Sequence, residues 1–135
     1  MTSTLSDAAR DLFAAREYVT LATIEADGQP HLSVVWAVLD GDDILVSTVE
    51  GRRKHANLVR DPRATVLLMP HDRPWIYVEA RGTVSMTREG GRDLIERLSH
   101  KYTDDERYSF DDGTQNVRVV VRLTPYKVIE YDGLA

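Results

Sequence analysis

Residues 18–48 read YVTLATIEADGQPHLSVVWAVLDGDDILVST, and this stretch contains the pattern that decides the fold. It opens with β-branched and aromatic residues, and the dipeptide Asp27-Gly28 that follows is a strong signal for a tight hairpin. A second strand is expected over residues 30–39 and a third over residues 44–48. Three consecutive strands joined by short turns form an antiparallel meander, which excludes a doubly wound parallel sheet for this half of the chain.

Outside this stretch, three segments have a composition or an apolar spacing that is typical of helices. Residues 6–16 are good helix formers, and Ser6 can cap their first turn. Residues 52–60 form a second helix that Pro62 stops, because the residue before a proline is pushed out of the α region. The third helix, over residues 92–102, carries its apolar side chains on one face.

The second half of the chain adds further strands and one long loop. Strands are predicted over residues 64–69, 74–84, 117–123 and 126–131. Gly82 marks a bulge or bend in the second of these. The acidic loop, residues 103–116, has no periodicity. About seven closely spaced strands with helices inserted among them predict a mainly β fold, a β-barrel or partly open barrel with peripheral helices.

Composition limits both the chemistry and the compartment. At 135 residues the chain has the size of one domain, and it holds no cysteine, which excludes disulfides, thiolate metal sites and a cysteine nucleophile. No apolar run is long enough to span a bilayer, and the first residues lack the pattern of a secretory signal. We therefore expect a cytoplasmic protein with no membrane partner. The net charge of −5 argues against a general nucleic-acid binder.

Positive charge is concentrated around the basic segment, residues 51–57. Residues 50–63 contain five basic and two acidic residues and so carry a net charge of +3, which leaves −8 for the rest of the chain. Cations at a helix start are disfavoured by roughly 0.3–1 kcal/mol each, because that end of the helix is already partly positive. A phosphate would compensate, with Arg52 binding it as a fork and Lys54 as a point charge. The alternative is a solvated basic surface.

Neighbouring polar and aromatic residues could complete such a site. Ser47 and Thr48 end the strand before the basic segment and could offer hydroxyl groups to the same anion. Asn57 lies one helical turn after Arg53 and would extend the polar surface of the helix. Three large aromatic residues of the predicted strands could wall a planar ligand, although core packing is the commoner role for each: Trp36, Trp75 and Tyr77.

No motif for metal binding, nucleotide binding or hydrolysis stands out in the sequence. No two of the four histidines lie at a metal-ligand spacing with a carboxylate in register. Walker, Gly-x-Gly-x-x-Gly and Gly-x-Ser-x-Gly patterns are absent. The sequence therefore predicts neither a metal site nor a catalytic triad or dyad.

The order and spacing of several short motifs resemble the pyridoxamine-phosphate-oxidase-like split-barrel family, in particular its branch that uses the deazaflavin coenzyme F420. The motifs cover nearly the whole chain and lie at residues 18–23, 27–33, 52–58, 61–64 and 79–83. The resemblance implies that residues 1–135 form a single split-barrel domain that binds a flavin or deazaflavin. It also implies a homodimer in which the cofactor lies in a groove at the interface and both subunits contribute to each site.

The resemblance also assigns roles to individual residues. Arg52 and Lys54 match positions that hold the cofactor phosphate, and Arg53 is accessory to them. Asn57 matches a helix-surface position near the cofactor tail or phosphate. The complete set of implied cofactor-binding residues is Ser33, Val34, Val35, Trp36, Ser47, Thr48, Arg52, Arg53, Lys54, Asn57, Trp75 and Tyr77.

The implied reaction is hydride transfer from the reduced deazaflavin to a small conjugated electrophile such as a quinone, an unsaturated lactone or a tetrapyrrole. This reaction needs binding and orientation more than an acid or base, so no catalytic side chain is expected. FMN is the alternative cofactor, and the cluster of Arg52, Arg53 and Lys54 favours F420 because it suits an anionic tail. Two other functions stay open. One is a non-catalytic protein that carries or senses the cofactor, and the other is a basic surface that docks a protein or nucleic acid.

Overall fold

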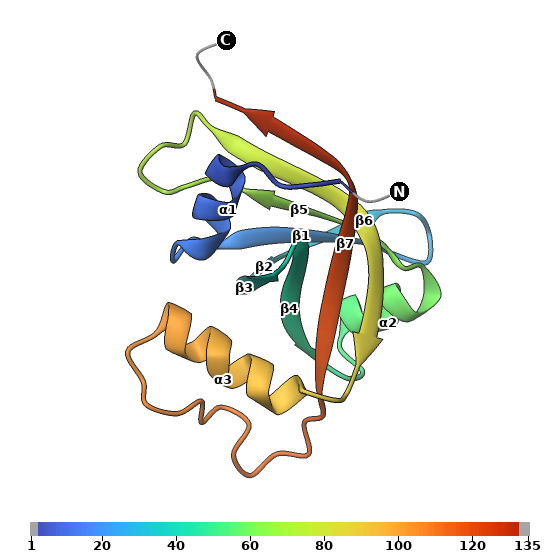
Figure 1. The fold of residues 1–135 in the computed structure, drawn as a ribbon. Coiled ribbons are helices and arrows are strands. Elements are labelled where there is room, and N and C mark those ends of the chain that lie inside the picture. The colour runs from blue at the N-terminus through green and yellow to red at the C-terminus, as the bar shows by residue number, and fades with distance from the viewer. Residues whose placement is uncertain (1–2, 133–135) are drawn as a thin grey trace.

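A curled antiparallel sheet of seven strands carries the fold (Figure 1). The computed structural model describes residues 3–132, so the ends of the predicted domain, residues 1–2 and 133–135, lie outside the described residues. The strands are β1 (Val19–Ile24), β2 (Pro30–Val35), β3 (Ala37–Asp40), β4 (Asp43–Val49), β5 (Arg63–Leu68), β6 (Tyr77–Thr87) and β7 (Arg118–Tyr131). The helices are α1 (Asp7–Ala14), α2 (Arg53–Arg60) and α3 (Gly91–Tyr102). The predicted class, a mainly β, partly open barrel with peripheral helices, is confirmed.

The strands follow the order β2-β1-β5-β6-β7-β4-β3 across the sheet, and the neighbouring pairs are antiparallel. The predicted hairpin joins β1 to β2, where Gly28 adopts the left-handed conformation (φ 90°) that a tight turn needs. Asp27 strengthens this turn, because its carboxylate accepts a hydrogen bond from the backbone N–H of Gln29 (3.0 Å).

The single strand expected over residues 30–39 is two strands, because the chain bends at Trp36. β2 lies at one end of the strand order and β3 at the other, so the single residue Trp36 connects the two ends of the sheet. The predicted three-strand meander is wrong in this respect, since β1 pairs with β2 and β3 with β4, while β2 and β3 are not neighbours. Curling of the sheet brings its two ends together and makes this connection possible.

The two strands expected over residues 117–123 and 126–131 form one long strand, β7. Pro125 interrupts the sequence pattern, but it pairs with Gly82 of β6, where the register of the two strands shifts. This irregularity lets the ladder continue past a residue that has no N–H donor. The bend predicted at Gly82 is therefore confirmed.

α1 and α3 pack against the sheet through the faces that their apolar spacing indicates. Leu58 of α2 lies in the same main apolar core as α1, inside the curled sheet, whereas α3 packs against the opposite face of β4 and β7. Ser6 caps α1 by accepting a hydrogen bond from the N–H of Ala9 (3.1 Å), and Phe13 of this helix is buried in the barrel core. α2 ends before the proline that was expected to stop it. The predicted apolar face of α3 is buried and consists of Leu94, Ile95 and Leu98.

A second, smaller apolar cluster fixes α3 against β4 and β7. Its buried members are Leu45, Leu94, Leu98, Tyr102 and Val120. Trp36 packs against this cluster, and its ring stacks on that of Tyr102 with the ring centroids 5.4 Å apart. The bend between β2 and β3 is thus held in place by α3. Among residues 3–132, no helix is long and apolar enough to cross a bilayer.

Candidate functional site

A cavity of about 240 Å³ lies where the bend after β2, the start of α2, α3 and the acidic loop come together. One part of its wall is cationic and the other part is aromatic and aliphatic. The residues that line it are Tyr18, Val34, Val35, Trp36, Ser47, Arg52, Lys54, Ile95, Leu98, Tyr108 and Arg118. A second, mostly apolar cavity of about 300 Å³ shares Tyr18 and Val34 with it, so the two cavities adjoin.

The cationic wall is formed by the start of α2 and by β7. Arg52 is the N-cap residue of α2, and its extended backbone (φ −68°, ψ 162°) sets the helix start. The first turn of α2 contains no acidic residue, and within the described residues no carboxylate forms an ion pair with Arg52 or Lys54. Burial lowers the pKa of Lys54, and the positive charges of Arg52 and Arg118 lower it further. An anion placed among these cations would relieve this repulsion.

Arg118 is the third cation of the cavity, and its side chain is only 5% exposed. Its Nε and Nη2 donate to the two carboxylate oxygens of Asp111 (2.7 and 3.0 Å), and Nη2 also donates to the hydroxyl of Tyr108 (2.7 Å). Its Nη1 lies 3.4 Å from Ser47 Oγ. The guanidinium therefore connects the acidic loop with the end of β4.

Sequence reasoning missed Arg118 and Tyr108. The alternating pattern of residues 117–123 places Val117 inward and Arg118 outward, whereas Arg118 is buried and Val117 is 39% exposed. Tyr108 lies in a segment without periodicity, so no pattern directs it toward the cavity. A basic residue at the start of an apolar strand, soon after an acidic loop, is the one sequence signal that could have indicated a buried ion pair with Asp111.

Six of the residues assigned by resemblance line the cavity: Val34, Val35, Trp36, Ser47, Arg52 and Lys54. Their neighbours Ser33 and Thr48 do not. Side chains alternate along a strand, so Thr48 faces the opposite side of the sheet from Ser47, whereas Ser33 shares the face of Val35 but lies two residues further from the bend at Trp36. Each of these two hydroxyl oxygens is buried without a hydrogen-bond partner within the described residues.

Arg53 and Asn57, one helical turn apart on α2, face β1 and the hairpin instead of the cavity. Arg53 forms an ion pair with Glu25 (3.2 Å). The expectation that Asn57 lies on the helix surface is wrong, because its side chain is buried, donates to Thr23 Oγ1 (3.0 Å) and accepts from Arg60 (3.1 Å). The hydrogen bond from Asn57 to Thr23 attaches α2 to β1.

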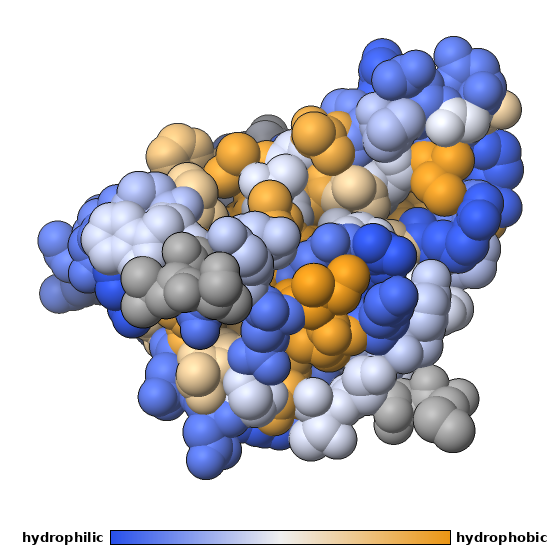
Figure 2. Space-filling model, turned by 90° about the horizontal axis from the view of Figure 1, so that it is seen from above, coloured by the Kyte–Doolittle hydropathy of each residue, from blue (hydrophilic) through white to orange (hydrophobic). Residues whose placement is uncertain are grey.

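The two aromatic residues expected on one strand near the site lie elsewhere. Trp75 precedes β6 in a turn and is 53% exposed, so its assignment to a strand is wrong. Tyr77 begins β6 and stacks on Tyr131 with ring centroids 5.3 Å apart. It lines a separate cavity of about 450 Å³ between α1 and the ends of β6 and β7. Figure 2 looks onto this upper side of the molecule, where apolar side chains form patches among polar ones.

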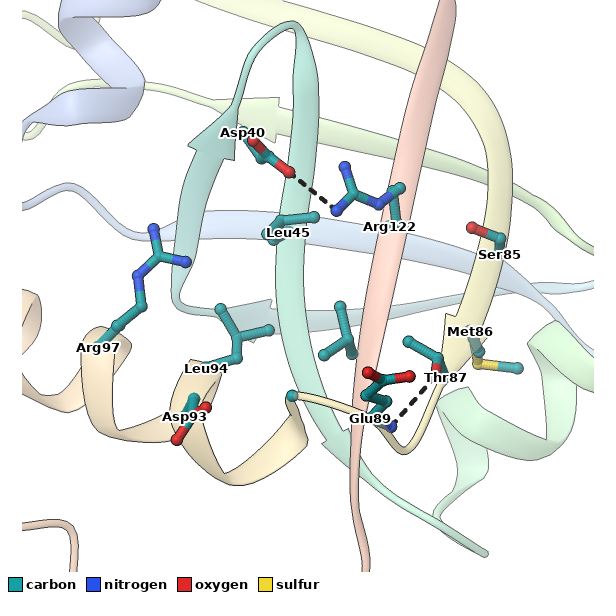
Figure 3. A pocket seen from close by; sticks show the side chains of 12 residues that line it. Asp40, Leu45, Ser85, Met86, Thr87, Glu89, Asp93, Leu94, Arg97 and Arg122 are labelled. Carbon is teal, nitrogen blue, oxygen red and sulfur yellow. Dashed lines mark hydrogen bonds and ion pairs between the residues drawn. The ribbon is translucent and has the colours of Figure 1, made fainter.

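A further cavity of about 300 Å³ lies between α3 and the sheet (Figure 3). It contains none of the predicted site residues. Its Arg122 is paired with Asp40 and Asp43 (2.9 Å each), so this cation is already neutralised by two carboxylates. This cavity therefore differs in kind from the first cavity, whose Arg52 and Lys54 have no such carboxylate partners within the described part of the chain.

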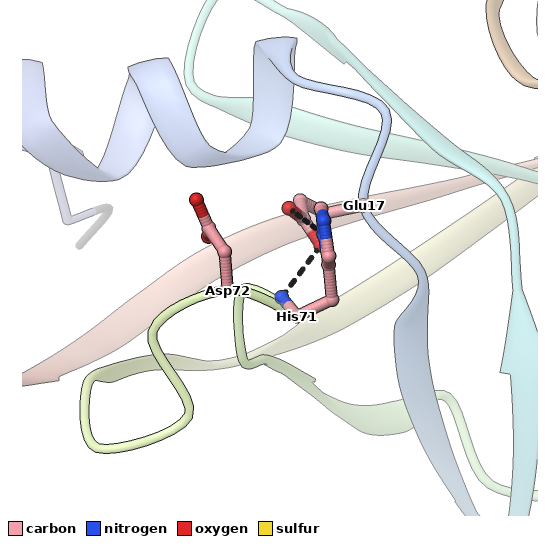
Figure 4. A group of neighbouring side chains, drawn as sticks. All are labelled: Glu17, His71 and Asp72. Atoms are coloured by element: carbon pink, nitrogen blue, oxygen red, sulfur yellow. Dashed lines mark hydrogen bonds and ion pairs between the residues drawn. The ribbon is translucent and has the colours of Figure 1, made fainter.

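Glu17, His71 and Asp72 lie together beside the second cavity (Figure 4). His71 Nδ1 lies 2.7 Å from one carboxylate oxygen of Glu17, and the backbone N–H of His71 donates to the other (3.0 Å). One possible ligand atom from each of the three residues lies within 4.8 Å of the others. The spacing of the histidines along the chain gives no sign of this group, because Glu17 and His71 are 54 positions apart.

Comparison with known proteins identifies the family. The family described as pyridoxamine 5'-phosphate oxidase matches residues 5–132. A solved structure named F420 reductase has 22% sequence identity and a TM-score of 0.81, with 93% of this chain and 98% of that chain covered. A conserved hypothetical protein from Mycobacterium tuberculosis has 29% identity and a TM-score of 0.78, with coverage of 97% and 87%. General Stress Protein 26 from Bacillus anthracis has 15% identity and a TM-score of 0.68, with coverage of 90% and 89%. Because the family match spans nearly the whole chain, this protein belongs to the pyridoxamine 5'-phosphate oxidase family.

Proposed function

We propose that residues 1–135 form one split-barrel domain that binds the deazaflavin F420 and works as an oxidoreductase toward a small conjugated electrophile. The observation that carries this proposal is the convergence of Arg52, Lys54 and Arg118 in one cavity beside the aromatic ring of Trp36. The solved structure named F420 reductase, which shares the fold, supports the choice of cofactor. FMN is the alternative.

The shape and charge of the site fit a ligand that joins a phosphate to a planar ring. Arg52 and Lys54 would hold the phosphate, since neither forms an ion pair with a carboxylate of the described residues. Val34, Val35 and Trp36 would lie along the ring. The cavity of about 300 Å³ that shares Tyr18 and Val34 extends the site in an apolar direction, which suits a conjugated substrate.

Orientation is the main demand of the proposed reaction on the protein. When bound, reduced F420 supplies a hydride. Trp36 is suited to orienting a ring because two other rings fix its own position. It stacks on Tyr102 and lies edge-on to Tyr108, with centroids 5.4 and 6.5 Å away. The buried faces of Ile95 and Leu98 exclude water from the same cavity.

Titration of the purified protein with F420 and with FMN, followed by fluorescence, tests the choice of cofactor. We expect F420 to bind more tightly than FMN, with a Kd below about 100 µM, which corresponds to roughly −5.5 kcal/mol. Failure of both to bind at that level would overturn the proposal. Binding of F420 without turnover against quinones, unsaturated lactones and tetrapyrroles would indicate a cofactor carrier instead of an enzyme.

We further propose that the protein is a homodimer with the cofactor groove at its interface. The outer face of β1, β2 and β5 is apolar and exposed at Leu32 (62%), Val34 (68%) and Leu67 (39%). In the ladder, Thr20 of β1 pairs with both Val34 and Leu67, so these side chains form one continuous patch. Contiguous apolar patches of this kind mark interaction surfaces. The patch adjoins the cavity at Val34.

A Leu32→Asp substitution is expected to shift the protein from dimer to monomer, because it places a charge within this apolar patch, next to Val34 on the same face of β2. Size-exclusion chromatography with light scattering measures the change. Val59→Asp is the matched control, since Val59 is equally exposed (66%) but lies on α2, away from the patch. A monomeric wild-type protein, or a Leu32→Asp variant that stays dimeric, would contradict the assignment of the interface.

A further inference from the structure

The acidic loop is tied to the candidate site through one buried carboxylate, that of Asp111. The side chain of Asp111 is only 9% exposed, although the segment around it is largely exposed. It accepts hydrogen bonds from three partners: Arg118, Arg92 (2.8 Å) and Asn116 (2.9 Å). The hydrogen bonds from Arg118 contribute most to lowering the pKa of Asp111 to about 2. The carboxylate is therefore charged across the physiological range, and it fixes the middle of the loop to β7.

The donors of Arg118 are divided between the loop and the cavity. A guanidinium has five N–H donors in a rigid plane. Nε and Nη2 are committed to Asp111 and to the hydroxyl of Tyr108. Nη1 has only a long contact, 3.4 Å to Ser47 Oγ, and Arg118 lines the cavity together with Arg52 and Lys54. The edge of the guanidinium that Asp111 leaves free is therefore the edge available to an anion.

The acidic loop also supplies one wall of the cavity. Tyr108 lies edge-on to Trp36, with ring centroids 6.5 Å apart, and its ring lies under the Arg118 guanidinium at 5.1 Å. The backbone N–H of Tyr108 donates to the carboxylate of Glu96 on α3 (3.1 Å). Tyr108 and Asp111 accept hydrogen bonds from the same Nη2 atom of Arg118, so the orientation of this guanidinium links the Tyr108 wall to the Asp111 carboxylate.

We propose that Asp111 is a positioning residue for ligand binding, which aims Arg118 at the phosphate of the ligand and thereby couples phosphate binding to closure of the acidic loop over the cavity. Tyr108 then determines which planar groups fit beside Trp36. This inference rests on the anion site of the proposed function. Coupling between two equilibria is reciprocal. The factor by which a phosphate bound to Arg118 favours the closed loop therefore equals the factor by which loop closure increases the affinity for phosphate.

Hydrogen exchange of residues 103–116, combined with F420 titration, tests the coupling. In the wild-type protein, saturating F420 is expected to slow exchange of the loop, and millimolar inorganic phosphate is expected to slow it in the same segment. Asp111→Asn is expected to speed exchange of the free loop, to abolish the slowing by either ligand, and to weaken F420 binding at least about tenfold, the effect of one misdirected hydrogen bond to a charged group.

Asp112→Asn is the matched control. Asp112 neighbours Asp111 in the same loop, but its side chain is 53% exposed and pairs only with Arg107 among the described residues. This variant is expected to retain F420 affinity and the slowing of exchange by the ligand. Tyr108→Phe provides a second, milder perturbation that keeps the packing and removes only the acceptor of the Arg118 Nη2 hydrogen bond. It is expected to speed loop exchange and to reduce the protection that F420 confers.

The outcomes separate this inference from the proposed function. If Asp111→Asn binds F420 as the wild type does, or if neither ligand alters exchange of the wild-type loop, the coupling does not exist. If Asp111→Asn does not fold, unchanged loop exchange and ligand protection in Tyr108→Phe would overturn the inference. If the protein binds neither F420 nor FMN, or keeps its affinity when Arg52 and Lys54 are replaced, the proposed function itself is wrong.

Discussion

A variant carrying both Arg52→Ala and Lys54→Ala is expected to bind F420 at least about a hundredfold more weakly than the wild type. Hydrogen bonds to charged groups contribute about 1.5–3 kcal/mol each, and the variant removes two residues that can make them. Neither side chain forms an ion pair with a carboxylate of the described residues, so its loss should leave the melting temperature nearly unchanged. Fluorescence titration and thermal melting of the same samples measure both quantities.

Arg53→Ala is the control for this experiment, because Arg53 belongs to the same helix turn and carries the same charge. Its guanidinium is turned away from the cavity toward Glu25. We expect its replacement to change F420 affinity by no more than about threefold, the size of a screened long-range effect. An equal loss in Arg53→Ala and in the double variant would mean that the basic segment attracts anions by its net charge and has no defined site.

The pH dependence of binding gives an independent view of Lys54. Burial and the neighbouring Arg52 and Arg118 lower the pKa of the free Lys54 ammonium. A bound phosphate would raise this pKa, so binding takes up a proton in the pH range between the two values. F420 affinity should therefore fall as pH rises through that range, and Lys54→Arg should flatten the decline, since arginine stays protonated.

The largest expected effect on stability comes from Gly91→Ala. A Cβ atom at this position would lie 2.7 Å from the carbonyl carbon of Arg118 and closer still to its carbonyl oxygen. These are backbone atoms of β7, which cannot rotate out of the way, so α3 would have to move from the sheet. We expect a loss of about 3 kcal/mol of unfolding free energy and a fall in Tm of roughly 10 °C, measured by thermal and denaturant unfolding.

Gly113→Ala separates this steric clash from backbone strain. Gly113 has a left-handed backbone (φ +73°), and nothing lies within 4 Å of a Cβ built on it. Its replacement should cost only about 1 kcal/mol, the strain of placing alanine in that conformation. If Gly91→Ala were no more destabilising than Gly113→Ala, the close packing of α3 on β7 would be wrong.

The parts of the fold that sequence predicted are those decided by local chemistry. Gly28 can adopt the backbone of a tight turn, and Pro62 stops a helix whatever surrounds it, so the hairpin and the end of α2 were predictable. The break at Trp36 was not, because residues 30–39 form an unbroken strand pattern. Only contacts with Tyr102, distant in sequence, show that the chain bends there.

The candidate site was likewise predicted only in part. The basic segment was visible because its charge is concentrated within a few residues, and the structure places Arg52 and Lys54 in one cavity. Asn57 was misplaced because a helical repeat fixes which residues share a face but not whether that face meets solvent or β1. Arg118 was missed because its burial depends on Asp111, a partner in a loop without periodicity.

The two strands that Trp36 connects, β2 and β3, also affect the tendency of the protein to aggregate. β2 and β3 each have one strand neighbour, so each leaves a row of backbone N–H and C=O groups that no described strand takes up, and such rows are templates for fibril growth. α3 blocks the row of β3 at Ala37, whose N–H donates to the Tyr102 hydroxyl (3.2 Å) and whose carbonyl accepts from Lys101 (2.7 Å). The row of β2 ends beside the cavity at Val34 and Val35. A ligand seated there would cover this end of the β2 row, so an occupied site should leave a shorter edge open to pairing with another chain.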